Sequence, residues 1–219
     1  MMGKQSWKAG NMLYPVPAVM FSFKRAGEKP NIITVAWAGT VCSEPAMVSI
    51  SVRKERYSHD IITDSGEFVI NLVTEKLTGA CDWCGVRSGR DCYKFREKKL
   101  TEYKSEFMDT PAIAESPVNI YCKVVNIDRL GSHDMFIGKV MGVTVDDAYM
   151  DEKGRFALER CGLIAYSHGE YYALGRKLGK FGYSVKKPSG SAKKKTAAGT
   201  VNGTVKKKAP TGKGRIKHE

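Results

Sequence analysis

The stretch Ala46-Met47-Val48-Ser49-Ile50-Ser51-Val52 is the clearest structural signal in the sequence. Its apolar side chains alternate with Met47 and two serines, which is the period of a β-strand that buries one face. The same alternation returns over residues 118–124 and 135–145. In the second of these, the apolar parity is shared by Met135, Ile137, Met141, Val143 and Val145, with Lys139 as the exception. Shorter apolar runs lie at residues 18–23, 32–37 and 68–72. These runs predict a mainly β protein.

Helical signals are few and short. Ser58 precedes His59-Asp60-Ile61-Ile62, which predicts an N-cap and a brief helix whose positive end favours Asp60. Thr74 predicts a second helix start, and residues 91–97 predict a third helix. A long alternation of strands and helices is missing, which argues against a doubly wound parallel sheet. The pattern favours a β-barrel with a few short helices at its rim.

The formal net charge of +13 lies mostly in the last part of the chain. Residues 185–219 hold eleven of the 36 Lys and Arg but one of the 23 Asp and Glu. We therefore predict a folded domain over residues 1–184 and a disordered, Lys-rich C-terminal tail over residues 185–219. Such a tail is usually a solvated end. Its alternative function is nonspecific, salt-dependent contact with nucleic acid or acidic lipid, without base stacking because no aromatic residue is present.

No run of the sequence approaches the roughly 18 apolar residues of a membrane span, and residues 1–11 are polar, unlike a secretory signal. The expected location is cytoplasmic, where the six cysteines remain mostly reduced. Cys81 and Cys84 form a Cys-x-x-Cys, and Cys92 follows. Ordinary reduced thiols are the favoured interpretation. A redox-active pair and a metal site without an evident fourth ligand remain open.

The glycine-rich fingerprints that cradle phosphates in other cofactor folds are absent from the sequence. A phosphate would instead be held by side chains and scattered backbone N–H groups. Residues 52–58 place Arg53 and Ser58 at the predicted helix start, where charge, hydrogen bonds and the helix dipole all favour an anion. The alternative for this segment is a solvated basic loop with an ordinary serine cap.

Five segments follow one another in a recognisable order. They are residues 31–44, which contain Trp37-Ala38-Gly39-Thr40; residues 52–58; residues 88–95, Ser-Gly-Arg-Asp-Cys-Tyr-Lys-Phe; residues 131–140, Gly-Ser-His-Asp-Met-Phe-Ile-Gly-Lys-Val; and residues 163–175, which contain Tyr-Tyr-Ala-Leu-Gly. Together they resemble the flavin reductase-like family of FMN-binding split barrels, and its flavoredoxin-type members most of all. The departure is Ser132, where the family commonly has Asp. The resemblance covers nearly the whole of residues 13–184.

The resemblance implies a Greek-key split barrel that binds FMN non-covalently as a homodimer, with FMN cavities formed by both protomers. It assigns the ring edge to Trp37, Ala38, Gly39 and Thr40, the phosphate to Arg53 and Ser58, and the remaining faces to Lys94, His133 and Tyr166, with Asn31 in the matching set. Taken one at a time, these residues have plainer alternatives. Trp37 could be a core tryptophan beside a turn, Lys94 an exposed helix lysine, and His133 a loop histidine.

Two functions follow from the resemblance. The first is an enzyme in which NADH or NADPH delivers a hydride to FMN, which then reduces free flavin or another acceptor. This chemistry belongs to the cofactor and requires no catalytic residue beyond cofactor contacts, with His133 on the nicotinamide side. The second is an electron carrier of the flavoredoxin type, which exchanges electrons with a partner protein without using NAD(P)H directly. A third function, a basic nucleic-acid-binding module, depends on the tail alone.

Overall fold

The computed structural model describes residues 3–185. The chain separates into two units, Met1–Arg176 and Lys177–Glu219. Of the second unit, residues 177–185 are described, and they end in the 3-10 turn η4 (Tyr183–Val185). The predicted Lys-rich tail lies, from residue 186 onward, outside the described residues. Its disorder and its contact with nucleic acid therefore stay predictions.

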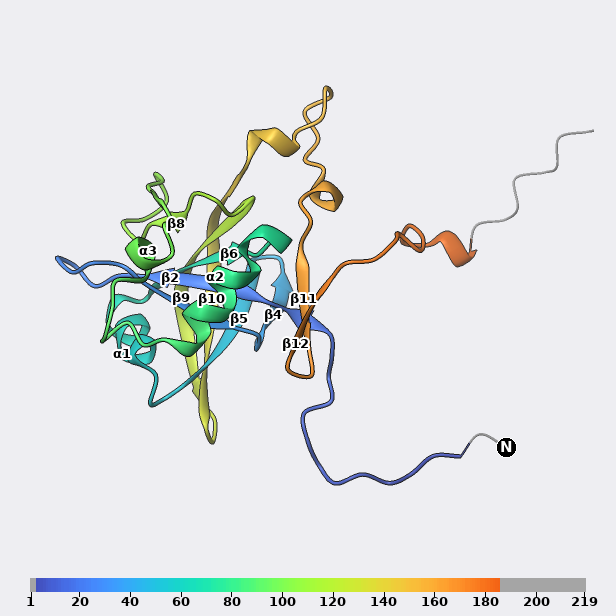
Figure 1. Cartoon of the computed structure of the whole chain (residues 1–219), viewed down its shortest axis with the longest axis horizontal. Helices are drawn as coiled ribbons and strands as arrows, with labels where there is room; N and C mark the ends of the chain where they lie inside the picture. Colours follow the sequence, from blue (N-terminus) through green and yellow to red (C-terminus); the bar gives the residue numbers. More distant parts are fainter. Residues whose placement is uncertain (1–2, 186–219) are drawn as a thin grey trace, which may run out of the picture. The chain divides into compact units, whose positions relative to one another are not determined.

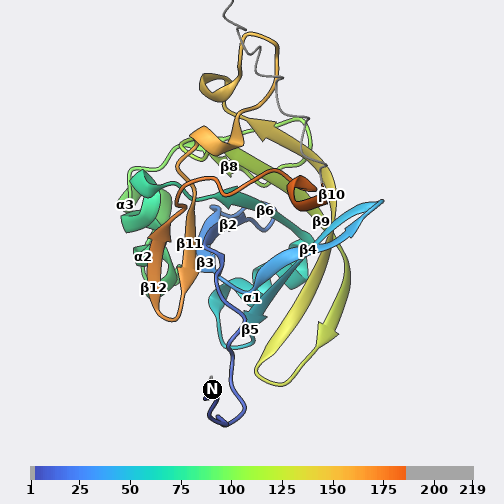
Figure 2. The same cartoon turned by 90° about the vertical axis from the view of Figure 1, so that its right-hand side faces the viewer.

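The first unit is built around a seven-stranded sheet in which every neighbouring pair is antiparallel. In spatial order the strands are β3 (Asn31–Val35), β2 (Val19–Phe23), β6 (Glu67–Leu72), β9 (Val118–Arg129), β10 (His133–Val145), β5 (Ala46–Arg53) and β4 (Ala38–Ser43). The sheet curls around a core (Figures 1 and 2). The backbone N–H of Ser51 donates to the carbonyl of Trp37 at 2.9 Å, which ties β5 to the turn after β3. The predicted mainly β split barrel is confirmed.

Smaller elements surround this sheet. A three-stranded sheet contains β1 (Val16–Pro17), β11 (Ile164–Ser167) and β12 (Glu170–Ala173), and a two-stranded one contains β7 (Glu102–Tyr103) and β8 (Ala112–Ile113). The helices are α1 (Tyr57–Ser65), α2 (Thr78–Val86) and α3 (Lys94–Glu97), with 3-10 turns η1 (Glu75–Leu77), η2 (Asp147–Tyr149) and η3 (Leu158–Arg160). Over residues 3–185, none of the helices is long and apolar enough to cross a membrane.

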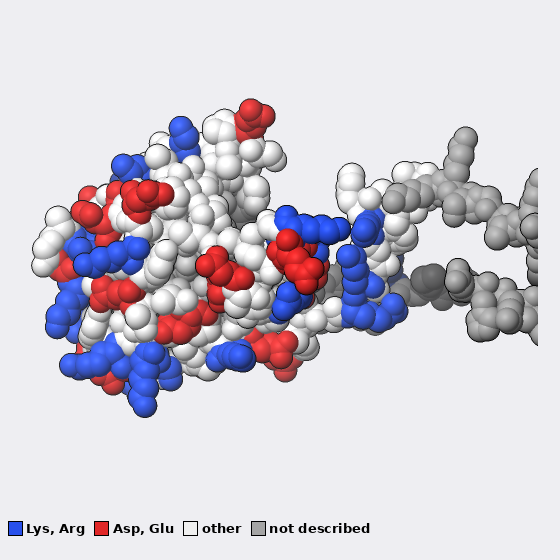
Figure 3. Space-filling view, turned by 90° about the horizontal axis from the view of Figure 1, so that it is seen from above, with Lys and Arg blue, Asp and Glu red and all other residues white. Residues whose placement is uncertain are grey.

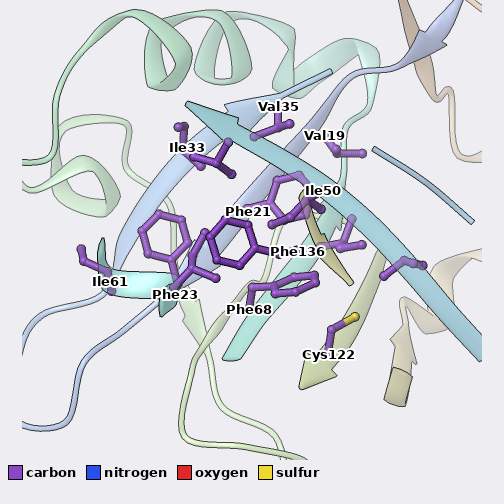
Figure 4. Close-up of a cluster of buried hydrophobic side chains, with 14 residues drawn as sticks. Val19, Phe21, Phe23, Ile33, Val35, Ile50, Ile61, Phe68, Cys122 and Phe136 are labelled. Carbon is purple, nitrogen blue, oxygen red and sulfur yellow. The ribbon is translucent and has the colours of Figure 1, made fainter. Parts of the chain in front are cut away.

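Strand β2 is buried along its whole length because its two faces contact two different clusters. Val19, Phe21 and Phe23 point into the barrel, where Figure 4 shows Phe68 and Phe136 beside them. Met20 belongs to a second cluster with residues of α2 and α3, including Cys81, Cys84 and Phe95. Each fully buried side chain of this size stabilises the fold by about 1.5–3 kcal/mol. The helices therefore form a layer that covers the outer side of β2 and β3.

The charged side chains of the first unit are mixed rather than segregated. Figure 3 shows Lys and Arg (blue) interspersed with Asp and Glu (red) over the left part of the visible face. Exposed ion pairs such as Arg25–Asp64 and Arg155–Asp151 contribute to this mixture. The near balance of charge in residues 1–184 is thus visible on the surface.

Two local predictions are corrected by the structure. Arg56, not Ser58, is the N-cap of α1, because the chain already turns where the N–H of Arg56 donates to the carbonyl of Arg53. Asp60 lies in the first turn, as predicted. The apolar run 32–37 does not form one strand. β3 stops at Val35, and Ala38 begins the separate strand β4.

In β10 the buried positions are not the ones that carry the alternating apolar residues of the sequence. Asp134, Phe136 and Gly138 are buried, whereas Met141, Val143 and Val145 are exposed. Gly138 is one of the positions that face inward, and its missing side chain leaves room for Phe68, since a Cβ on Gly138 would lie 2.5 Å from the Phe68 ring. One-residue register shifts follow at 137/138 and 140/142. An apolar row on β10 is therefore left uncovered in the single chain.

Candidate functional site

Three connected cavities line one side of the first unit. The aromatic pocket, about 320 Å³, is bounded by Trp37, Tyr166, Tyr171 and residues 33–36 and 51–53. The basic cleft, about 450 Å³, is bounded by Arg53, Arg56, Ser58, Arg87, Arg90 and Lys94. The outer pocket, about 880 Å³, is bounded by residues 10–13, 36–39 and 130–133. Arg53 and Arg56 line both of the first two cavities, and Trp37 and His133 line both the aromatic and the outer pocket. The result is one continuous groove.

The groove exists because strands end where a helix approaches. β3 stops at Val35 and β5 stops at Arg53, and the last residues of both strands line the aromatic pocket. Helix α2 forms the opposite wall. The Thr34 hydroxyl donates to the carbonyl of Cys81, and a Cβ on Gly85 would lie only 3.2 Å from the Thr34 Cβ. Glycine at position 85 therefore lets α2 lie directly against β3.

Lys94 is the most unusual side chain of the groove. It is 2% exposed, and its Nζ donates to the carbonyls of Ile32 and Cys84 at 2.7 Å each. No carboxylate pairs with it among the described residues. Burial lowers the pKa of Lys94 to about 8, against the partly opposing effect of Cys84 and Cys92 and with a further lowering by Arg56. An ammonium group has three N–H donors, so one remains for a ligand in the basic cleft.

The start of α1 adds backbone donors to the same cleft. Arg56 makes no capping side-chain bond, and within the described residues the N–H groups of Tyr57 and Ser58 have no acceptor. Unpaired N–H groups at a helix N-terminus attract anions. Arg56 is close enough to lower the pKa of Lys94, and Arg53 is paired at 3.1 Å with Glu55, which also lines the cleft. Cations, a hydroxyl and free N–H groups together suit a phosphate.

The aromatic pocket has a different character. The rings of Tyr166 and Tyr171 meet edge-on at 5.6 Å, and Tyr14 lies 6.0 Å from Trp37. His133 stands where the aromatic and outer pockets meet, and its Nδ1 lies 2.8 Å from the Ser132 hydroxyl. Burial, and then the charge of Arg53, lowers the pKa of His133, so its imidazole is neutral at pH 7. The pocket suits a flat, aromatic group.

Most of the site residues predicted from the sequence meet in this groove. Trp37, Arg53, Ser58, Lys94, His133 and Tyr166 line it, and Ala38 and Gly39 line its outer pocket. Asn31 lies behind the basic cleft and donates to the Ser58 hydroxyl at 3.5 Å. Thr40 is exposed on β4 and lines none of the three cavities. Their roles toward a ligand stay proposals.

Sequence reasoning missed two prominent lining residues, Arg56 and Tyr171. Both stand inside segments that were quoted for other residues, 52–58 and 163–175. The signal for Arg56 was its place at the helix start, and that for Tyr171 was its pairing with Tyr166 across β11 and β12. The first was visible in the sequence once the helix start was correct. The second required the register of the two strands.

The Cys-x-x-Cys lies on α2 with both thiols buried. Burial raises the pKa of Cys81 to about 12 and that of Cys84 to about 11. A redox-active or metal-binding thiol requires a lowered pKa, and the described residues contain no cluster of three potential metal ligands. These surroundings favour ordinary, structural thiols in the cluster beneath β2.

The buried Lys94 ammonium predicts a pH dependence of stability. Its folded pKa, about 8, lies below the ordinary value of 10.5, so between these pH values the unfolded chain binds more protons and stability rises with pH. The free energy of unfolding of the wild type minus that of Lys94→Met should therefore increase by roughly 2 kcal/mol over this window. Urea unfolding at several pH values measures this difference. Lys98→Met is the control, and an equal trend in both variants would contradict the assignment to Lys94.

Comparisons with known proteins agree with the architecture. The family model described as the flavin reductase like domain matches residues 12–175. The structure is similar to flavoredoxin of Desulfovibrio vulgaris (Miyazaki F), with 31% identity, a TM-score of 0.78, and coverage of 84% of this chain and all of that chain. The flavoredoxin from Methanosarcina acetivorans, at 22% identity and a TM-score of 0.76 over 84% of this chain and all of that one, shares the fold.

A curated relative extends the match at the level of sequence. An uncharacterised protein of Archaeoglobus fulgidus is 32% identical over 144 residues, which are 65% of this chain and 81% of that protein. The family model covers the β-barrel, helices α1–α3 and every lining residue of the groove except Gly10 and Asn11 of the outer pocket. On these grounds the chain belongs to the family of flavin reductase like domains.

Proposed function

We propose that the chain binds FMN in the groove and is an NAD(P)H-dependent flavin oxidoreductase that passes electrons to free flavin or another acceptor. The observation that carries this proposal is the continuity of the aromatic pocket with the basic cleft through Arg53 and Arg56. FMN has a flat ring joined to a phosphate by a short chain. A groove with an aromatic end and a cationic end matches both parts.

The basic cleft fits the phosphate on the strength of its own residues. Lys94 supplies a third N–H, Ser58 a hydroxyl, and the start of α1 two unpaired N–H groups. Arg53 and Arg56 add charge at the boundary with the aromatic pocket. A buried cation without a carboxylate partner is costly in free energy, and a phosphate would offset that cost.

The aromatic pocket would hold the ring. Trp37 and Tyr166 offer apolar faces, and the backbone at the ends of β3 and β5 offers hydrogen bonds to the ring edge. Ala38 and Gly39 open the way to the outer pocket without bulky side chains. In this arrangement Asn31 acts on the phosphate through Ser58, and Thr40 would require a second chain to take part.

Bound FMN supplies a ring that accepts a hydride and hands electrons on. The residues of the aromatic pocket would position this ring and shield it from water, next to the outer pocket with which they share Trp37 and His133. His133, neutral at pH 7, stands at that opening and would contact the nicotinamide or the acceptor without repelling a cationic nicotinamide ring. Proton transfer by a catalytic acid is not needed for direct hydride transfer.

A second candidate function is supported by the similarity to flavoredoxin, which covers the whole of that protein at 31% identity. As an electron carrier, the chain would use the same FMN site but exchange electrons with a partner protein. The exposed position of the outer pocket suits either a small acceptor or a docked protein. Both functions are compatible with a reducing cytoplasm, in which the six free cysteines would stay reduced.

The two functions differ in the response to nicotinamide. If the chain is a reductase, a stoichiometric amount of NADH or NADPH should bleach the flavin absorption band of the FMN-loaded protein under anaerobic conditions within the time of catalysis. Stopped-flow absorption measures the rate with each nucleotide. A band that persists until dithionite is added would contradict the reductase and support the carrier.

The role of Trp37 can be tested with a matched tryptophan. Trp37→Ala should weaken FMN binding about tenfold, because it removes an apolar face from the aromatic pocket. Trp7→Ala should leave the affinity unchanged, since Trp7 is 83% exposed and lines none of the three cavities. Quenching of FMN fluorescence measures both dissociation constants. Equal affinities for the two variants would remove Trp37 from the site.

We also propose that the chain forms a homodimer through the uncovered apolar row of β10. Met141, Val143 and Val145 are 39–47% exposed, and Val125 of β9 and Val41 of β4 add to the same sheet at 52% and 50% exposed. Contiguous exposed apolar side chains on a sheet are typical of an interaction surface. A second copy is the occupant that the family resemblance implies, and it would bring residues near Ala38 and Thr40 of the first.

Disrupting this row should separate the protomers. Val143→Asp should shift the sedimentation-equilibrium mass from that of two chains to that of one, because a buried unpaired carboxylate is strongly unfavourable. Leu158→Asp, at a site 45% exposed on η3, should leave the dimer intact. A wild type with the mass of one chain would refute the dimer itself.

A further inference from the structure

Behind the loop formed by residues 53–58 lies a buried carboxylate that the proposed FMN site does not use. Asp134 of β10 is 1% exposed, and its Oδ2 lies 3.0 Å from the Nε2 of His59. Its Oδ1 lies 3.4 Å from the Nζ of Lys54, and within residues 3–185 it has no other close polar partner. Arg129 is more distant, at 4.0 Å from Oδ2. A buried charge with so few partners depends strongly on each of them.

The partners of Asp134 stand beside the residues of the basic cleft in the same segment, with Lys54 after Arg53 and His59 after Ser58. Arg53, Arg56 and Ser58 line the cleft, whereas Lys54 and His59 contact Asp134 on the other side of the same loop. Two backbone turns link the positions, since Arg56 N–H donates to Arg53 and His59 N–H donates to Arg56. The loop is thus held from behind at Lys54 and His59, while Arg53, Arg56 and Ser58 line the basic cleft.

The anchor itself is rigid. Asp134 lies opposite Val52 in the β10–β5 ladder, one position from the Arg53–His133 pair. The His59 ring packs edge-on against Phe136 at 5.4 Å, inside the barrel core. Burial acts to raise the pKa of Asp134, but hydrogen bonds from His59 and Lys54 outweigh it and hold the pKa below its ordinary value. Asp134 is therefore an anion over the whole neutral range.

We propose that Asp134 is a positioning residue that, through His59 and Lys54, holds the loop 53–58 so that its cations and the start of α1 face the phosphate of the ligand. This inference rests on the proposed FMN site. Asp134 does not touch the ligand in this arrangement. Asp134 instead sets the positions of the hydrogen-bond donors of the loop 53–58. Its effect is therefore specific to the phosphate end of the groove.

The positioning role and a simple charge effect predict opposite changes in FMN affinity when Asp134 is replaced. Removing an anion near a phosphate site strengthens phosphate binding by Coulomb's law. Removing the anchor of the loop weakens it, because misplaced charged hydrogen bonds are lost. Riboflavin, which has the ring but no phosphate, reports on the aromatic pocket alone. Comparing FMN with riboflavin therefore separates the position of the loop from the integrity of the barrel.

The experiment measures the dissociation constants of FMN and riboflavin for the full chain by flavin fluorescence. Asp134→Asn should weaken FMN binding about tenfold and leave riboflavin binding nearly unchanged. Asp60→Asn is the matched control, because Asp60 contacts the other ring nitrogen of His59 at 3.3 Å but is 66% exposed. It should not weaken the binding of either ligand. Tighter FMN binding by Asp134→Asn, or an equal loss for both ligands, would overturn the proposal.

Two variants of His59 keep the test decisive if Asp134→Asn does not fold. His59→Phe preserves the ring packing on Phe136 but removes the hydrogen bond, and it should reproduce the phosphate-specific loss. His59→Gln keeps an N–H donor and should restore FMN affinity. A loss that Gln does not restore would overturn the positioning role. If the wild type binds FMN no more tightly than riboflavin, the proposed FMN site fails instead.

Discussion

The constraint on which the structure depends is that β2 and β3 must be covered on both faces. Their residues alternate between the barrel interior and the cluster beneath α2 and α3, so neither strand can face water. Helix α2 must therefore lie against β3, and the contact of Gly85 with Thr34 shows how closely it does so. β3 ends at Val35, one residue after this contact. Residues of α2 and of the end of β3 both line the aromatic pocket.

The strands were predictable because burial of one face leaves a period of two in the sequence. Val48, Ile50 and Val52 are buried as their alternation predicts. The failure at β10 has a physical reason, since periodicity identifies an apolar face but not what covers it. There the inward parity is occupied by Phe136 and by Gly138, whose missing side chain makes room for Phe68. The apolar outward positions are the ones that the proposed homodimer would cover, which the pattern alone does not indicate.

The site was predictable to the extent that its residues stand in recognisable segments. Trp37, Lys94, His133 and Tyr166 come from four separate segments and line one groove. What the sequence could not reveal was the depth of each residue. A lysine at the start of a four-residue helix would be expected to be exposed. Lys94 is instead buried, and its Nζ donates to two backbone carbonyls at 2.7 Å. Tyr171 required the register of β11 and β12, which depends on contacts between distant segments.

The charged residues around the groove include two that are buried, one anion and one cation. Asp134 is a buried anion behind the loop 53–58, and Lys94 is a buried cation in front of it, with Arg53 and Arg56 between them. Asp134 contacts Lys54 and His59, whereas within residues 3–185 the Nζ of Lys94 donates to two neutral carbonyl groups and has no carboxylate partner. The uncompensated end of this series is the one that opens to the basic cleft. The proposed FMN phosphate would complete this order of charges and offset the cost of burying a lysine at that point.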